Sequence, residues 1–129
     1  GCPVTWLSRW KPQHASREFL LRLAVTEAES WLLADASGLA TFLGVSDKKI
    51  AAQPDSLIDP TREILQLARQ SRKRMIRQEV VSAFDPSKAG PGYNLHLCTF
   101  VQANWDPRRA SERSPSLARA VVRLQALAS

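Results

Sequence analysis

The chain has 129 residues, 44% of them hydrophobic, and a formal net charge of +6. This length and apolar content suit one domain with a buried core, over residues 1–129, and exclude two. No apolar run approaches the roughly 20 residues of a membrane-spanning helix, and no secretory signal pattern is present. We therefore expect a cytoplasmic protein with no membrane partner.

The two cysteines and two histidines lack the spacing of a zinc site or a disulfide framework. We expect Cys2 and Cys98 to be reduced thiols, with Cys98 in the core. Charge is distributed unevenly: residues 1–61 carry six basic and seven acidic side chains, whereas residues 62–129 carry twelve and five. A basic second half is typical of a protein that binds a polyanion, although a solvated basic surface without a partner fits equally well.

Residues 1–16 show no clear period and predict an irregular lead-in. Residues 19–25 (FLLRLAV) have the length and apolarity of a buried strand. A helix is expected from Thr26 onward, where Glu29 stands at the capping-box position and would bond the Thr26 amide. The carboxylates of Glu27 and Glu29 thus follow the end of a strand, where open α/β sheets bind their ligands.

Five further helices are expected along the chain. A short helix over residues 38–43 is expected to end at Gly44, and a polar connector to occupy residues 45–57. Asp59 and Pro60 form a cap-then-proline start for a helix with a break near Ser71. Its apolar face is expected to contain Ile64, Leu65, Leu67 and Ala68, continued by Met75, Ile76 and Val80.

Residues 90–92 (GPG) require a turn, after which Asn94 is expected to cap a helix running through Val101. Residues 106–107 (DP) and 114–115 (SP) repeat the cap-then-proline device. In the final helix one apolar face is expected to hold Leu117, Val121, Leu124 and Ala128. The chain itself is therefore predicted to be mostly α-helical, with five or six helices and one or two strands.

Five segments resemble, in order and spacing, the signatures of an uncharacterised bacterial family found near mobile and defence elements. They are residues 24–35 (AVTEAESWLLAD), 54–60 (PDSLIDP), 90–94 (GPGYN), 105–107 (WDP) and 114–117 (SPSL). That family is distantly related to the topoisomerase-primase (Toprim) domains. The resemblance covers residues 19–127 and implies an α/β Toprim-like fold of which this chain is the C-terminal portion.

A Toprim-like domain binds Mg²⁺ through a glutamate after its first strand and an Asp-x-Asp after its third, for phosphoryl transfer on nucleic acid. This sequence has no Asp-x-Asp, and Thr61 stands where the resemblance implies a lysine. By the resemblance, Glu27 and Glu29 are the candidate catalytic residues and Glu27 the candidate metal ligand. We expect Mg²⁺ binding to be weak or absent in this chain alone, and a homodimer or a missing N-terminal half to complete it.

A cluster of basic residues is the candidate nucleic-acid interface. Five cations fall within nine residues, namely Arg69, Arg72, Lys73, Arg74 and Arg77, and Arg108 and Arg109 (with Arg113) extend the patch. Phosphate contacts of this kind give salt-sensitive, sequence-independent affinity. Tyr93, beside the glycine turn, is a candidate for stacking on a base; its alternative role is to pack the loop.

Two functions follow from these patterns. The first is Mg²⁺-dependent nuclease-like phosphodiester chemistry, incomplete in this chain. The second is a noncatalytic helical module that binds nucleic acid or a protein partner.

Overall fold

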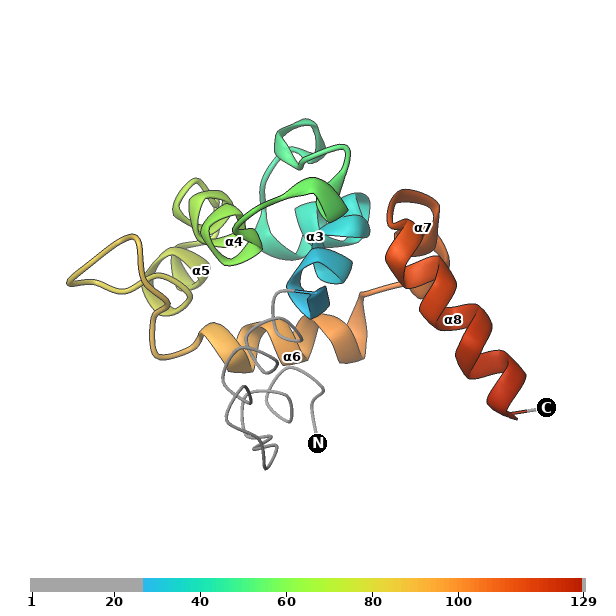
Figure 1. Ribbon diagram of the computed structural model, residues 1–129. Coiled ribbons are helices and arrows are strands. Elements are labelled where there is room, and N and C mark those ends of the chain that lie inside the picture. The colour runs from blue at the N-terminus through green and yellow to red at the C-terminus, as the bar shows by residue number, and fades with distance from the viewer. Residues whose placement is uncertain (1–26, 129) are drawn as a thin grey trace, which may run out of the picture.

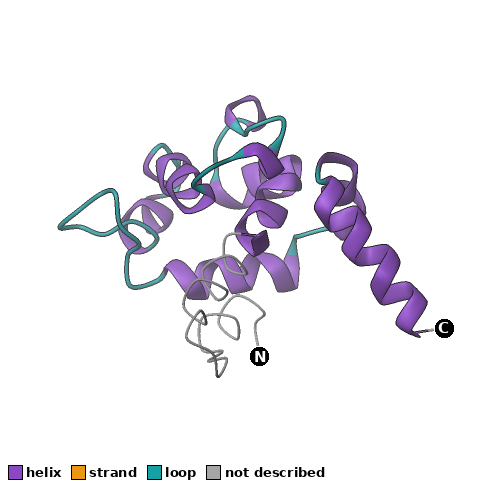
Figure 2. Cartoon of the chain, in the orientation of Figure 1, coloured by secondary structure: helices purple, strands orange, loops and turns teal. Residues whose placement is uncertain are grey.

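The computed structural model describes residues 27–128, so the expected lead-in and strand (residues 1–16 and 19–25) lie outside the described residues. The described part is mostly helical, as predicted for the chain itself (Figure 2). Its β structure is limited to an isolated antiparallel bridge between Val81 and Ala89. None of the described helices is long and apolar enough to cross a bilayer.

The helices follow one another along the chain, with longer connections at residues 44–59 and at residues 80–92 (Figure 1). In chain order they are residues 27–34, α3 (Ala36–Leu43), α4 (Pro60–Arg69), α5 (Arg74–Glu79), α6 (Tyr93–Ala103), α7 (Pro107–Arg113) and α8 (Pro115–Ala128), with 3-10 turns η1 (Asp47–Lys49) and η2 (Pro54–Ser56) between α3 and α4. In Figure 1, α4 and α5 lie at one end of the molecule and α7 and α8 at the other, where α8 projects from the body.

The cap-then-proline signals in the sequence mark true helix starts. The Asp59 carboxylate accepts a hydrogen bond from the Arg62 amide at 3.1 Å, and the Asp106 carboxylate accepts one from the Arg108 amide at 2.8 Å. These bonds satisfy backbone donors that the first turn of a helix leaves unpaired. The predicted end of α3 is also confirmed, since Gly44 has a φ of 73°, which glycine adopts without strain.

Two local predictions were wrong. Met75 is 61% exposed, because the break at residues 70–73 starts a new helix whose inward residue is Ile76. Asn94 does not cap α6, which begins one residue earlier, with Gly92 at the cap position. Gly90 holds the preceding loop against the end of α5, since its amide donates to the Val80 carbonyl at 2.8 Å and a Cβ there would lie 2.5 Å from the Glu79 carbonyl oxygen.

The buried residues form two clusters. The larger is built from residues 27–34, α3, α4, α5 and α6, with Phe100, Leu33 and Ile64 among its fully buried side chains. The smaller joins Ala34 to Ala110 on α7 and Leu117 on α8. Because the two clusters meet along the helix of residues 27–34, that helix links α7 and α8 to the rest of the core.

Cys98 is buried on α6, as expected of a core residue, but it is disulfide-bonded, so the expectation of a reduced thiol was wrong. The only other cysteine of the sequence, Cys2, lies outside the described residues.

Candidate functional site

The first candidate site surrounds Glu29, whose carboxyl group is buried between three helices. Glu29 is 2% exposed and accepts hydrogen bonds from the Thr61 hydroxyl, at 2.7 Å, and from the Tyr93 hydroxyl. Thr61 lies in the first turn of α4, and Tyr93 is the first residue of α6. Glu29 thus joins the starts of two helices to residues 27–34. The predicted bond from Glu29 to the Thr26 amide falls partly outside the described residues.

Burial determines the protonation behaviour of this group. Loss of solvent raises the pKa of Glu29 above its ordinary value, and the bonds from Tyr93 and Thr61 oppose this only in part. Burial, together with the neighbouring Glu29 charge, also raises the pKa of Tyr93. The Tyr93 hydroxyl therefore stays protonated and acts as a donor to Glu29.

These positions do not fit the Mg²⁺ site that the resemblance implies. Mg²⁺ needs several oxygen ligands in octahedral geometry, but both Glu29 oxygens already accept bonds from hydroxyl groups. Glu27 is only two residues earlier on the same helix, which places it on roughly the opposite face. Within residues 27–128 no three His, Cys, Asp or Glu side chains gather in a way that could hold a metal.

Tyr93 does not fit its predicted role as a stacking platform. The residue is 7% exposed and its hydroxyl is bonded to Glu29. A base needs an accessible ring face, which this burial does not leave. The alternative role, packing the loop and the helix start, agrees with its position in the larger core cluster.

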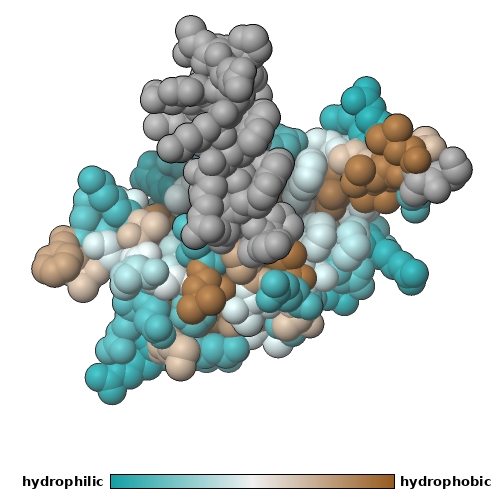
Figure 3. Space-filling model, turned by 90° about the horizontal axis from the view of Figure 1, so that it is seen from below, coloured by the Kyte–Doolittle hydropathy of each residue, from teal (hydrophilic) through white to brown (hydrophobic). Residues whose placement is uncertain are grey.

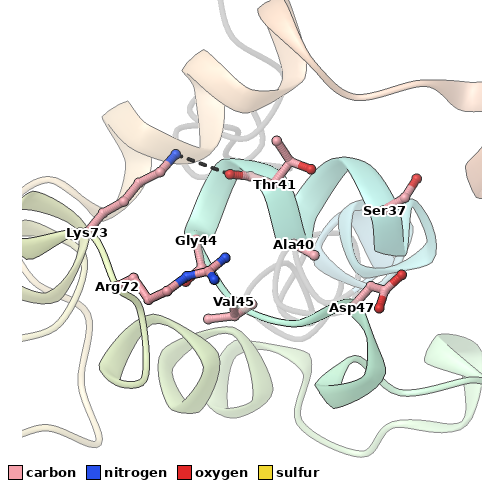
Figure 4. A pocket seen from close by; sticks show the side chains of 8 residues that line it. All are labelled: Ser37, Ala40, Thr41, Gly44, Val45, Asp47, Arg72 and Lys73. Carbon is pink, nitrogen blue, oxygen red and sulfur yellow. Dashed lines mark hydrogen bonds between the residues drawn. The ribbon is translucent and has the colours of Figure 1, made fainter.

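The predicted basic run divides into bound and free side chains. Lys73 directs its ammonium group to the C-terminal end of α3, where Nζ lies 3.1 Å from the Thr41 carbonyl oxygen and 2.8 Å from that of Phe42 (Figure 4). Arg72 donates from Nε to the Gly44 carbonyl at 3.3 Å. The cations thus satisfy carbonyls that have no partner within α3 and complement the negative end of its dipole.

Two further predicted interface residues are also bound. Arg77 donates from Nη1 to the Ser71 carbonyl at 2.6 Å. Arg109 binds Asp35 with two contacts, Nε to Oδ1 at 2.8 Å and Nη2 to Oδ2 at 3.0 Å. Asp35 is fully buried and also accepts from the amides of Gly38 and Asp106. Arg109 therefore neutralises a buried carboxylate.

Burial alone would raise the pKa of Asp35, but the bonds from Arg109 and the two amides hold it below its ordinary value. Asp35 thus stays ionised and connects the start of α3 to α7. Asp35 was not among the site residues predicted from the sequence. A usable signal was present, because Asp35 directly precedes a short run of helix-compatible residues and so stands at a natural N-cap.

A second group of arginines is exposed. Arg62, Arg69, Arg74 and Arg108 have no hydrogen bond or ion pair to their side chains within residues 27–128. Two of them, Arg62 and Arg69, line one cleft of about 520 Å³ together with Thr61, Gln66 and Ser87. Asp59 is the only acid lining it, and this carboxylate also accepts the Arg62 amide. The cleft is polar and carries net positive charge.

Comparisons with known proteins assign no family. No protein-family model, curated protein or solved structure matches the chain. The Toprim resemblance therefore stays an expectation from the five sequence segments, and the site is interpreted from its own geometry.

Proposed function

We propose that this chain is a noncatalytic helical module that binds nucleic acid through the free arginines of α4 and α5. The observation that carries the proposal is the cleft lined by Arg62 and Arg69, whose guanidinium groups have no partner within the described residues. The two residues are seven positions apart, so they share a face of α4 about two turns apart. Arg74, at the start of α5, adds a third cation without a partner within the described residues.

Guanidinium groups suit this role because they stay charged and present a planar fork of donors to phosphate oxygens. Each phosphate neutralised releases counterions, which makes the affinity depend steeply on salt and little on base sequence. Side chains already bonded within the protein, such as Lys73, contribute charge but not a free donor fork. Of the predicted interface residues, Arg69, Arg74 and Arg108 keep a guanidinium group without a partner within the described residues, and the proposal adds Arg62, which the sequence prediction did not include.

The test is fluorescence anisotropy with labelled single- and double-stranded oligonucleotides of unrelated sequence, titrated over a range of salt concentrations. We expect Arg62→Ala and Arg69→Ala each to weaken binding and to lower the slope of log K against log salt by about one. Arg123→Ala, on α8, removes the same charge far from the cleft and is the matched control. Absence of binding at low salt, or an equal loss in all three variants, would contradict the proposal.

A second candidate function is the phosphodiester chemistry implied by the Toprim resemblance, with Glu27 as its residue. Glu27 is half-exposed, and its carboxylate has no hydrogen-bond or ion-pair partner within the described residues. Plasmid nicking with Mg²⁺ or Mn²⁺ that disappears in Glu27→Ala would support it. Cleavage that survives this substitution would refute the placement. Because residues 27–128 do not fit a Mg²⁺ site, we derive no metal-dependent step for them.

With this second candidate function we also propose the α/β Toprim-like architecture. We further propose that a homodimer or a missing N-terminal half completes it. A cytoplasmic location is likewise a proposal.

A further inference from the structure

The helix α8 carries an apolar stripe that begins inside the protein and continues into solvent. Leu117 is 4% exposed in the smaller core cluster, and Val121 is partly buried against that cluster. Further along the helix the exposed fraction rises to 66% at Leu124 and 84% at Leu127. Figure 3 shows this hydrophobic surface as a brown patch over α8, beside the C-terminal end.

The spacing of these residues makes the stripe a single helix face. With about 100° between successive residues, Leu117, Val121, Leu124 and Leu127 fall within an arc of about 120°. This width is that of a helix face that packs on another helix. The third exposed large apolar side chain of α8, Val122, is 64% exposed but lies on the opposite side of the helix.

Charge is present on one flank of the stripe only. Arg119 and Arg123, one turn apart, lie beside Leu127 on the helix circumference, and α8 contains no Asp or Glu. Both arginines are exposed, and neither has a side-chain partner within residues 27–128. The face therefore combines exposed leucines with two uncompensated positive charges.

We propose that the α8 face binds an amphipathic helix of a partner protein, whose apolar stripe packs on Leu124 and Leu127 and whose carboxylates pair with Arg119 and Arg123. Interfaces between helices commonly combine apolar central residues with flanking charges that select the partner. A second copy of α8 is a poorer occupant, because its own arginines would be brought beside Arg119 and Arg123 without a carboxylate.

An anionic bilayer would also attract leucines and arginines, but the geometry disfavours it. The part of the stripe that extends from the partly buried Val121 to Leu127 rises only about 9 Å, less than two turns. Interfacial helices use longer apolar faces that lie along the membrane plane. The start of α8 is moreover fixed to the body, since the Trp31 indole donates to the Ser116 hydroxyl at 2.9 Å.

The probe for this proposal is a designed helical peptide with Leu at heptad positions a and d and Glu at e and g. Its control is the same peptide with Lys in place of Glu. Anisotropy of each labelled peptide, titrated with the full chain, should show binding of the Glu peptide and at least tenfold weaker binding of the Lys peptide. The double variant Arg119→Glu, Arg123→Glu reverses the charge of this flank and should bind the Lys peptide more tightly than the Glu peptide.

Two substitutions distinguish binding by the apolar stripe from nonspecific hydrophobic binding. Leu124→Asp should weaken binding of the Glu peptide at least tenfold, whereas Val122→Asp, an equally exposed apolar residue outside the stripe, should leave it within about twofold. Both side chains are exposed, so both variants are expected to fold, which circular dichroism checks.

Three results would overturn the proposal: no binding of the Glu peptide, equal binding of both peptides, or equal loss in the two variants. Sedimentation that shows a dimer dissociated by Leu124→Asp would assign the face to a second copy instead. Binding to phosphatidylglycerol vesicles, lost in the same variant while the peptide fails to bind, would assign it to a membrane. None of these outcomes depends on whether the arginines of α4 bind nucleic acid.

Discussion

Arg108 and Arg109 are adjacent in sequence and carry the same charge, yet the fold uses them differently. Arg109 is held by the buried Asp35, whereas Arg108 has a free side chain within the described residues. We expect Arg109→Ala to lower the free energy of unfolding, because it leaves the buried Asp35 carboxylate without its cation, and we expect screening by water at the half-exposed Arg109 to moderate the loss.

Arg108→Ala is the matched control and should change stability by less than about 0.5 kcal/mol, as measured by urea denaturation. The pH dependence gives a second readout. Since the pKa of Asp35 is lowered, its contribution is present above the ordinary value of 3.8 and is lost as pH falls through the lowered pKa. A similar loss in both variants would contradict a structural role specific to Arg109.

Glu29 has the opposite pH behaviour. Its pKa is raised above the ordinary value of 4.5, so its stabilising contribution is present below that pH and is lost as pH rises through the folded-state pKa. We expect Glu29→Gln to remove this decline, because glutamine keeps an acceptor for Thr61 or Tyr93 without a buried charge. Thermal unfolding of both proteins from pH 4 to 8 measures it; parallel curves would refute the assignment.

Individual residues were the hardest features to predict from sequence. The capping function of Asp59 is local, and its signal lies within three residues. The partners that bind Glu29 and Asp35 through their side chains lie 32 to 74 residues away, so no local pattern contains them. For the same reason the sequence could not separate the free Arg69 from the bound Arg72.

At the scale of elements, α8 depends on a residue from a distant turn. The Asp55 carboxylate, in η2, accepts the Ser114 hydroxyl at 2.7 Å and the Ser116 amide at 2.9 Å. A negative charge at a helix N-terminus satisfies its free amides and complements its dipole. Asp55→Ala is therefore expected to destabilise the protein by about 1 kcal/mol.

Hydrogen exchange should locate this effect in the first turn of α8. Asp47→Ala is the control, because Asp47 also lies in a 3-10 turn and its side chain has no partner within residues 27–128. Faster exchange spread evenly over all helices in the Asp55 variant would argue against a local cap.

Helix boundaries were the most predictable part of the fold. The starts at Pro60, Pro107 and Pro115 were marked by the residue pairs that begin helices, and the end of α3 by Gly44. The sequence predicted the helix break near Ser71, but it did not predict that this break leaves Met75 exposed. Which face of a short helix is buried depends on its neighbours, and that information lies outside the segment.

For the whole molecule, the distribution of charge along the sequence predicted a basic surface correctly, but it did not predict which basic residues are available to bind a ligand. The basic half of the sequence does place arginines on the outside, but several are used to neutralise Asp35 and to cap α3. The basic side chains that remain available to a ligand are therefore fewer than the sequence suggests. They can be identified only once the intramolecular partners of the other basic residues are known.

The bonds that hold α7 and α8 to the body also bear on how the chain folds. The contacts Trp31–Ser116, Asp35–Arg109 and Asp55–Ser114 join residues that are 85, 74 and 59 positions apart. Each of them joins α7 or the start of α8 to a segment that precedes α6 by many residues. Such long loop closures slow folding relative to helical proteins with local contacts. Two of these contacts, Trp31–Ser116 and Asp35–Arg109, would also join the two pieces produced by a cut in the connector of residues 45–57.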